Sequence, residues 1–136
     1  MLEVRVQARR LGPQASLATT KDAEISLDTA VEGRRDAFNP VELLMASLAA
    51  CMIKSVERLA PMLQIEFQGV EVTVHGVRQD SPPTIISIDY ELVIDTPEGD
   101  HGLELLHANV RKFGTIFNTI AAAVPLKGEI KRKGTA

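Results

Sequence analysis

The sequence has few of the residues on which most site chemistry depends: one cysteine, no tryptophan, one tyrosine and three histidines in 136 residues. A single cysteine excludes an internal disulfide, and no cysteine and histidine group has metal-ligand spacing. Aromatic residues make up only 4% of the chain, which argues against base stacking as a way to bind nucleic acid. We therefore expect no metal site and no cofactor.

The sequence also lacks an excess of positive charge. The formal net charge is −3, so we expect neither nucleic acid nor an anionic membrane surface as a partner. Residues 1–10 alternate between apolar and polar types instead of forming an apolar block, which predicts that there is no signal peptide. We expect a cytoplasmic protein. The hydrophobic content of 45% and the chain length predict one globular domain over residues 1–136.

Alternating patterns before the middle of the chain predict strands. In residues 2–10, Val4, Val6 and Ala8 share one face, as in a half-buried strand. Two shorter strands are expected at 15–19 and 24–28, and the three would form an antiparallel meander. A polar loop over residues 30–38 follows.

A buried helix is predicted over residues 39–61. Asn39 suits the N-cap, Pro40 the first helical position, and Glu42 can reach back to the cap amide. From residue 41 to 53 the segment is almost entirely apolar or small, which is typical of a helix buried on all sides. It is too short and too interrupted to cross a membrane, and Pro61 should end it.

The second half of the chain predicts an α+β fold with sheet at both ends of the sequence and the central helix against it. A long hairpin is expected from alternation in residues 69–79 and 86–95, with a bulge near Gly76. A helical stripe follows, and Thr115 should cap a short helix over residues 116–124 before a last strand at 126–132. The stripe consists of Leu103, Leu106, Val110 and Phe113.

Cys51, in the central helix, is the first candidate for chemistry, and two interpretations stay open. It is either a small core residue or a reactive thiol, and the second requires a nearby cation because only the thiolate attacks a peroxide. Cys51 lies too deep in the helix for help from the helix N-terminus. The candidate cations are Arg9, Arg10, Arg34 and Arg35, each of which is also explained as solvated surface charge.

Glutamate and histidine are the other residue types that could act beside the thiol. Glu42 is explained by the capping box alone, with pairing to an arginine as a second role. His75, His101 and His107 show no evident pairing with Cys51, and we expect all three to be surface residues.

Residues 39–51, N-P-V-E-L-L-M-A-S-L-A-A-C, resemble the signature of the OsmC/Ohr superfamily, the osmotically induced and organic-hydroperoxide-resistance proteins. The segment K-F-G-T-I-F-N-T-I at 112–120 is similar to the second motif of that family. The order of predicted elements agrees with the family over nearly the whole chain. The resemblance implies an OsmC-like fold, with antiparallel sheets wrapped around a long central helix in an intertwined homodimer.

The resemblance also implies a mechanism. In the peroxidase members a first cysteine attacks an organic hydroperoxide and becomes a sulfenic acid, and a second cysteine resolves it as a disulfide that a dithiol reopens. An arginine from the N-terminal strands and a glutamate of the Pro-x-Glu motif hold the first thiol as thiolate. The match assigns these roles to Cys51, to Arg10 with Arg9 as the next choice, and to Glu42.

Two positions depart from the family pattern. The resolving position falls on Gly114, which excludes the two-cysteine cycle, and Val41 takes the place where the hydroperoxide-resistance branch has its glutamate. The pattern is more similar to the divergent OsmC-like branch. Two functions therefore remain: peroxide reduction by one cysteine with an external thiol reductant, or a non-catalytic dimer that binds a small hydrophobic ligand at the subunit interface.

Overall fold

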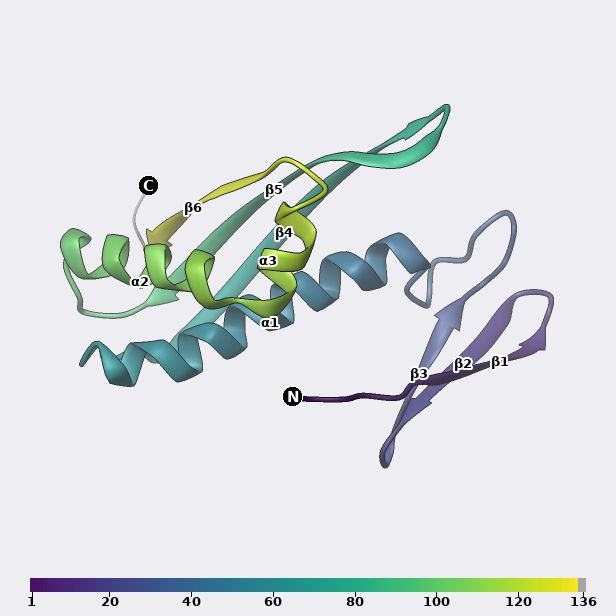
Figure 1. Cartoon of the computed structure of the whole chain (residues 1–136), viewed down its shortest axis with the longest axis horizontal. Coiled ribbons are helices and arrows are strands. Elements are labelled where there is room, and N and C mark those ends of the chain that lie inside the picture. The colour runs from purple at the N-terminus through teal and green to yellow at the C-terminus, as the bar shows by residue number, and fades with distance from the viewer. Residues whose placement is uncertain (135–136) are drawn as a thin grey trace. The chain divides into compact units, whose positions relative to one another are not determined.

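A computed structural model describes residues 1–134 of the chain (Figure 1). The chain forms two compact units, Met1–Leu44 and Met45–Ala136, and their boundary falls inside helix α1 (Pro40–Met62). The predicted α+β class is confirmed, with six strands and three helices in the described residues. The single domain over residues 1–136 stays a prediction.

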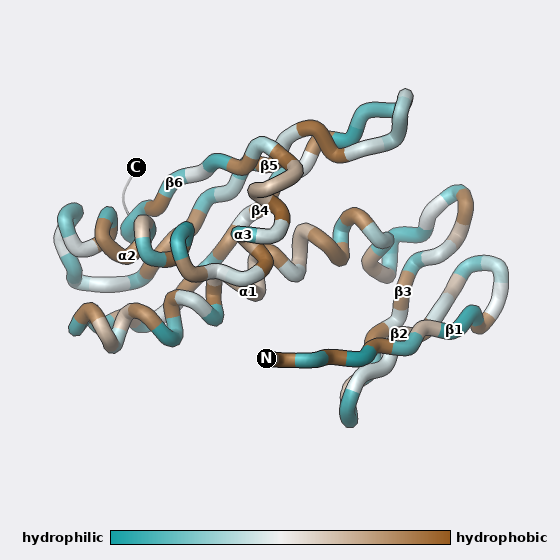
Figure 2. Tube along the Cα trace, in the orientation of Figure 1, coloured by the Kyte–Doolittle hydropathy of each residue, from teal (hydrophilic) through white to brown (hydrophobic). Residues whose placement is uncertain are grey.

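The first unit carries an antiparallel meander of β1 (Gln7–Gly12), β2 (Ala15–Thr20) and β3 (Ala23–Asp28), as predicted. The first strand begins at Gln7 and not at residue 2, so that expectation was wrong in its bounds. The face of Val4 and Val6 is also not buried within this chain, because these side chains are 80% and 63% exposed. Apolar and polar residues alternate along this segment in Figure 2, and no layer of the unit covers the apolar ones.

The loop that follows β3 is organised by Asp28, a carboxylate that is only 2% exposed. Its oxygens accept hydrogen bonds from the backbone N–H groups of Ala30 at 3.0 Å and Arg34 at 2.9 Å. The Asp28 N–H donates to the carbonyl of Phe38 at 2.9 Å. These bonds close the loop and lead the chain to the start of α1.

Helix α1 begins with the predicted capping box. The Asn39 N–H donates to Glu42 Oε1 at 2.9 Å, and the Glu42 N–H donates to Asn39 Oδ1 at 2.8 Å. The helix runs one residue past Pro61 to Met62. The expectation of burial on all sides was wrong for the single chain, because only one face is buried and Ile53 is 36% exposed. The buried residues are Leu48, Met52, Val56, Leu59 and Ala60.

The second unit contains a sheet in the order β4 (Gly69–Asp80), β5 (Pro83–Asp95) and β6 (Leu126–Arg132). β4 and β5 are antiparallel, as the hairpin prediction requires, and β6 adds parallel to β5. The bulge lies between Val77 and Arg78 instead of at Gly76. Gly76 has a different role: a Cβ there would stand 2.9 Å from the sulfur of Met45, so the glycine permits close packing against α1.

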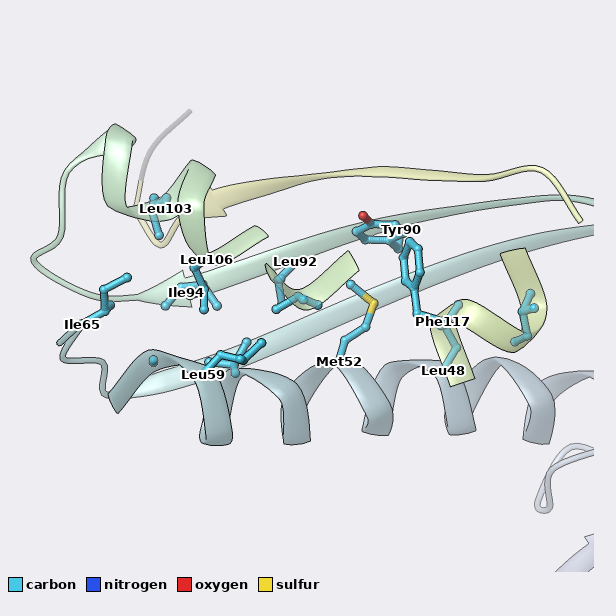
Figure 3. Close-up of a cluster of buried hydrophobic side chains, with 14 of the residues drawn as sticks. Leu48, Met52, Leu59, Ile65, Tyr90, Leu92, Ile94, Leu103, Leu106 and Phe117 are labelled. Atoms are coloured by element: carbon cyan, nitrogen blue, oxygen red, sulfur yellow. The ribbon is translucent and has the colours of Figure 1, made fainter. Parts of the chain in front are cut away.

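Helices α2 (Asp100–Phe113) and α3 (Thr115–Ala121) complete the core of this unit (Figures 1 and 3). Leu103, Leu106 and Val110 are buried as predicted, whereas Phe113 is 49% exposed. The predicted cap was wrong, because Gly114 occupies the N-cap of α3 and no side chain caps that helix. The core-facing residues of β5 are Ile88, Tyr90, Leu92 and Ile94.

Candidate functional site

Cys51 lies in α1 and is partly exposed in the single chain. Its neighbour is the junction between α2 and α3, which consists of Gly114 alone. A Cβ built on Gly114 would stand 3.4 Å from Cys51 Sγ. The fold therefore brings Cys51 and Gly114, where the resemblance places a second thiol, side by side, although 63 positions separate them in the sequence.

The Gly114 backbone is ordinary, with φ −72° and ψ 120°, a region open to any L-residue. Its surroundings are tight, because a Cβ there would lie 3.1 Å from both Phe117 Cβ and the Val110 carbonyl oxygen. The Gly114 N–H also donates to the Val110 carbonyl at 3.2 Å. The absence of a side chain thus lets the junction approach α1 closely at the sulfur.

A polar network that the sequence did not predict lies next to this junction. Tyr90 of β5 is 4% exposed, and its hydroxyl lies 2.6 Å from His107 Nε2 and 3.0 Å from Arg111 Nη1. The Arg111 guanidinium also stands 5.1 Å from the ring centroid of Phe117, which packs edge-on against Tyr90 at 5.9 Å. Figure 3 shows Tyr90 and Phe117 together above Met52 of α1.

The direction of one of these hydrogen bonds is fixed by chemistry. A guanidinium only donates, so the Tyr90 oxygen accepts from Arg111. The direction of the bond between the Tyr90 hydroxyl and His107 Nε2 depends on the tautomer of the histidine. Burial and, to a lesser degree, the Arg111 charge lower the pKa of His107. Burial raises the pKa of Tyr90, and Arg111 partly opposes that rise.

The expectation that His107 is an unremarkable surface residue was wrong. His107 falls one position outside the apolar stripe of α2. Its ring contacts Tyr90 of strand β5, and the spacing of residues within α2 could not predict that contact. The sequence feature that relates to this network is Gly128 of β6, which pairs with Tyr90. A Cβ at Gly128 would clash with the Tyr90 ring and carbonyl, so the absence of a side chain at residue 128 leaves space for the Tyr90 ring.

The other residues assigned with Cys51 lie in the first unit. Arg10 is an exposed residue of β1, and Glu42 is engaged in the capping box at the start of α1. Because Arg10 and Cys51 belong to different units, their pairing stays a prediction. The same is true of the second role of Glu42.

The alternative arginines differ in how far they are already engaged. Arg34 is held by Asp36 at 2.6 Å and also donates to the Gln14 carbonyl, so its guanidinium is largely occupied. Arg35 lines a surface pocket of about 410 Å³ together with Glu42. Arg9 lies in β1, where every residue but the last is exposed.

Residues 1–134 contain no group of three or more His, Cys, Asp or Glu side chains that could hold a metal ion. In the same part of the chain no helix has the length and apolarity needed to span a membrane.

Comparison with known proteins decides the family. The family model described as "OsmC-like protein" matches residues 32–129, which is well over half of the chain and includes Cys51 and Gly114. The chain belongs to the OsmC-like protein family. The resemblance drawn from residues 39–51 is thereby confirmed.

Solved structures agree with this fold. An OsmC-like protein from Mycoplasma pneumoniae is 19% identical, with a TM-score of 0.87 over 96% of this chain and 97% of that one. An organic hydroperoxide resistance protein OsmC from Legionella pneumophila, described as a predicted redox protein, is 21% identical, with a TM-score of 0.72 over 96% of this chain and 98% of that one. The organic hydroperoxide resistance protein OhrB of Bacillus subtilis is 24% identical, with a TM-score of 0.68 over 96% and 98%. At these identities the likeness establishes the OsmC-like fold.

No curated protein matches the sequence. The family model gives the family of this chain, and the activity has to be argued from its own residues.

Proposed function

We propose that this OsmC-like protein reduces organic hydroperoxides through Cys51 alone, with an external thiol as reductant. The observation that carries the proposal is the position of the Cys51 sulfur. Cys51 is partly exposed, and its sulfur lies 3.4 Å from where a Cβ on Gly114 would stand. In the family pattern, residue 114 is the position of the second thiol. Two structural neighbours named for organic hydroperoxide resistance support the choice of substrate class.

The chemistry requires one thiol in the protein and two from the reductant. The Cys51 thiolate attacks the outer oxygen of the hydroperoxide, the O–O bond breaks, and the alkoxide takes a proton and leaves as an alcohol. The sulfenic acid on Cys51 then condenses with a first external thiol, which releases water and forms a mixed disulfide. A second external thiol attacks that disulfide and restores Cys51. Arg10 and Glu42, from the N-terminal unit of either subunit, are the residues that we assign to thiolate stabilisation.

The proposed assembly is a homodimer, in agreement with the apolar surface that the single chain leaves uncovered. The buried apolar core lies entirely within residues 48–120, whereas the first unit buries only Ser16 and Asp28. Three strands need a hydrophobic face that is packed against something to be stable in water, and a second copy of the chain would supply that packing. A dimer would have twice the chain mass of 14.8 kDa, which light scattering measures directly.

Peroxide consumption tests the activity. The purified protein receives excess cumene hydroperoxide and a small-molecule dithiol, and the remaining peroxide is measured with time. Cys51→Ser should abolish the consumption, while Ser55→Ala, one turn further along α1, should leave it unchanged. Consumption that persists in Cys51→Ser, or none in the parent protein, would refute the proposal.

A second function, binding of a small apolar ligand, is favoured by one observation. The first unit has a pocket of about 250 Å³ whose exposed lining is apolar, close to the lower end of ligand-site volumes. Its lining includes Val6, Ile25 and Leu43. If decanoic acid binds to parent and Cys51→Ala protein alike, and Ile25→Glu removes that binding, this function stands without the peroxidase. Absence of binding to the parent protein rejects it.

A further inference from the structure

The junction beside the thiol is held by one side chain that crosses it. Arg111 lies in the last turn of α2, three residues before Gly114, while Phe117 lies three residues after it in α3. The guanidinium stands 5.1 Å from the Phe117 ring centroid and donates to the Tyr90 hydroxyl at 3.0 Å. Arg111 therefore connects α2, α3 and strand β5 at the point where the chain passes Cys51.

The surroundings of Arg111 exclude a simpler role as an ion pair. Within residues 1–134 the salt bridges of the structure involve other cations, and no Asp or Glu pairs with Arg111. Within these residues Arg111 donates a hydrogen bond to the buried Tyr90 hydroxyl, and its guanidinium carbon lies over the Phe117 ring. An arginine held in this way acts as a rigid brace, because the planar group fixes both contacts at once.

Arg111 is connected to Cys51 through Phe117 and Gly114. A Cβ on Gly114 would contact Phe117 Cβ at 3.1 Å and Cys51 Sγ at 3.4 Å, so the three positions are packed in series. Phe117 is 3% exposed and cannot move without displacing the junction.

We propose that Arg111 is a positioning residue for the thiol site: by bridging Tyr90 and Phe117 it holds the Gly114 junction against Cys51 and limits access to the sulfur. This deepens the proposed function, since it concerns the same thiol, but it predicts thiol accessibility and does not depend on peroxide turnover. Tyr90 supplies the acceptor for Arg111, and its hydroxyl also lies within hydrogen-bond distance of His107 Nε2.

The test is the rate at which iodoacetamide alkylates Cys51 between pH 6 and 10, followed by mass spectrometry on the intact protein. Arg111→Met keeps the aliphatic stem but removes the donor and the charge. We expect its plateau rate at alkaline pH to rise roughly tenfold, the factor that corresponds to loss of one charge-assisted hydrogen bond. Arg111→Lys keeps the charge but lacks the planar group, so its rate should stay raised; a full return to the parent rate would overturn the proposal.

The shape of the pH profile separates positioning from charge. If Arg111 acts by position, the plateau changes and the midpoint of the profile stays where it is in the parent. A moved midpoint with an unchanged plateau would overturn the proposal in favour of direct electrostatic action. Lys112→Met is the matched control, because it removes the adjacent cation, which stands 5.2 Å from the exposed Phe113 ring instead. An equal rise in that control would also overturn the proposal.

Tyr90→Phe keeps the test decisive if Arg111→Met does not fold. It removes only the hydroxyl that accepts the Arg111 hydrogen bond and leaves the ring packed on Phe117. Its alkylation rate should rise as well, and an unchanged rate overturns the proposal. If the parent protein consumes no peroxide but the variants are alkylated faster, the positioning role of Arg111 is supported and the proposed peroxidase activity is rejected. The two proposals can therefore fail separately.

Discussion

Replacing Gly114 with cysteine should create a disulfide with Cys51. The backbone at residue 114 has φ −72° and ψ 120°, which a cysteine adopts without strain. Its Cβ would start 3.4 Å from Cys51 Sγ, close enough for a new sulfur on that carbon to bond to the existing one. The parent chain has one thiol and forms no internal disulfide.

The expected gain in stability follows from two opposing terms. Closing a loop of about 64 residues stabilises the folded state by roughly 4 kcal/mol in the chain-entropy model. The new Cβ must displace Phe117 Cβ and the Val110 carbonyl, both at 3.1 Å. Such overpacking costs about 1–3 kcal/mol, so a net gain of about 1–3 kcal/mol is expected in the oxidised form.

Thiol counting and thermal unfolding measure the result. After mild oxidation the denatured Gly114→Cys protein should show no free thiol, and its Tm should fall on reduction by about 3–10 °C. Gly99→Cys is the matched control, because a Cβ there meets nothing within 4 Å and Cys51 is not among its neighbours. It should keep its thiols free or form only intermolecular disulfides. Two free thiols in oxidised, folded Gly114→Cys protein would refute the placement of the junction beside Cys51.

Three further predictions concern stability. Asn39→Ala should lower the free energy of unfolding by about 1 kcal/mol in urea titration, because the helix cap of α1 is lost; no change would contradict the observed capping box. Gly128→Ala should cost about 1–3 kcal/mol or more, because the new Cβ meets the Tyr90 ring and carbonyl, whereas Gly12→Ala has open space and should be near neutral. Because the fold lowers the pKa of His107, the unfolded chain binds the proton more readily; stability should be full above pH 6.5 and decline as the pH falls through the lowered value. Urea titrations at several pH values should show that His107→Gln removes this slope, and an equal slope in that variant would exclude His107 as its source.

Local patterns predicted the elements of the second unit well because its core lies within the unit. Strand β5 and the apolar stripe of α2 bury the residues that alternation and helical spacing indicate. The exceptions are local: Phe113 has no core to face at the end of α2, and a glycine at residue 114 leaves α3 without a side-chain cap.

The first unit and the face of α1 were predicted less well, for one physical reason. An apolar pattern shows which face of a strand or helix should be buried, but it does not show which part of the structure packs against that face. The residues around Val4 and Val6 carry a strand pattern, yet they lie exposed before β1, and Ile53 on α1 is also uncovered. The proposed homodimer would cover these positions.

Residue types at short spacing were enough to identify the family, the capped central helix and Cys51 as the only thiol. The position of Gly114 against the sulfur and the reach of Arg111 to both Tyr90 and Phe117 came instead from packing between elements. Such contacts join residues from separate elements, and their distances depend on how helices α1, α2 and α3 pack on the sheet. No pattern within one element contains that information.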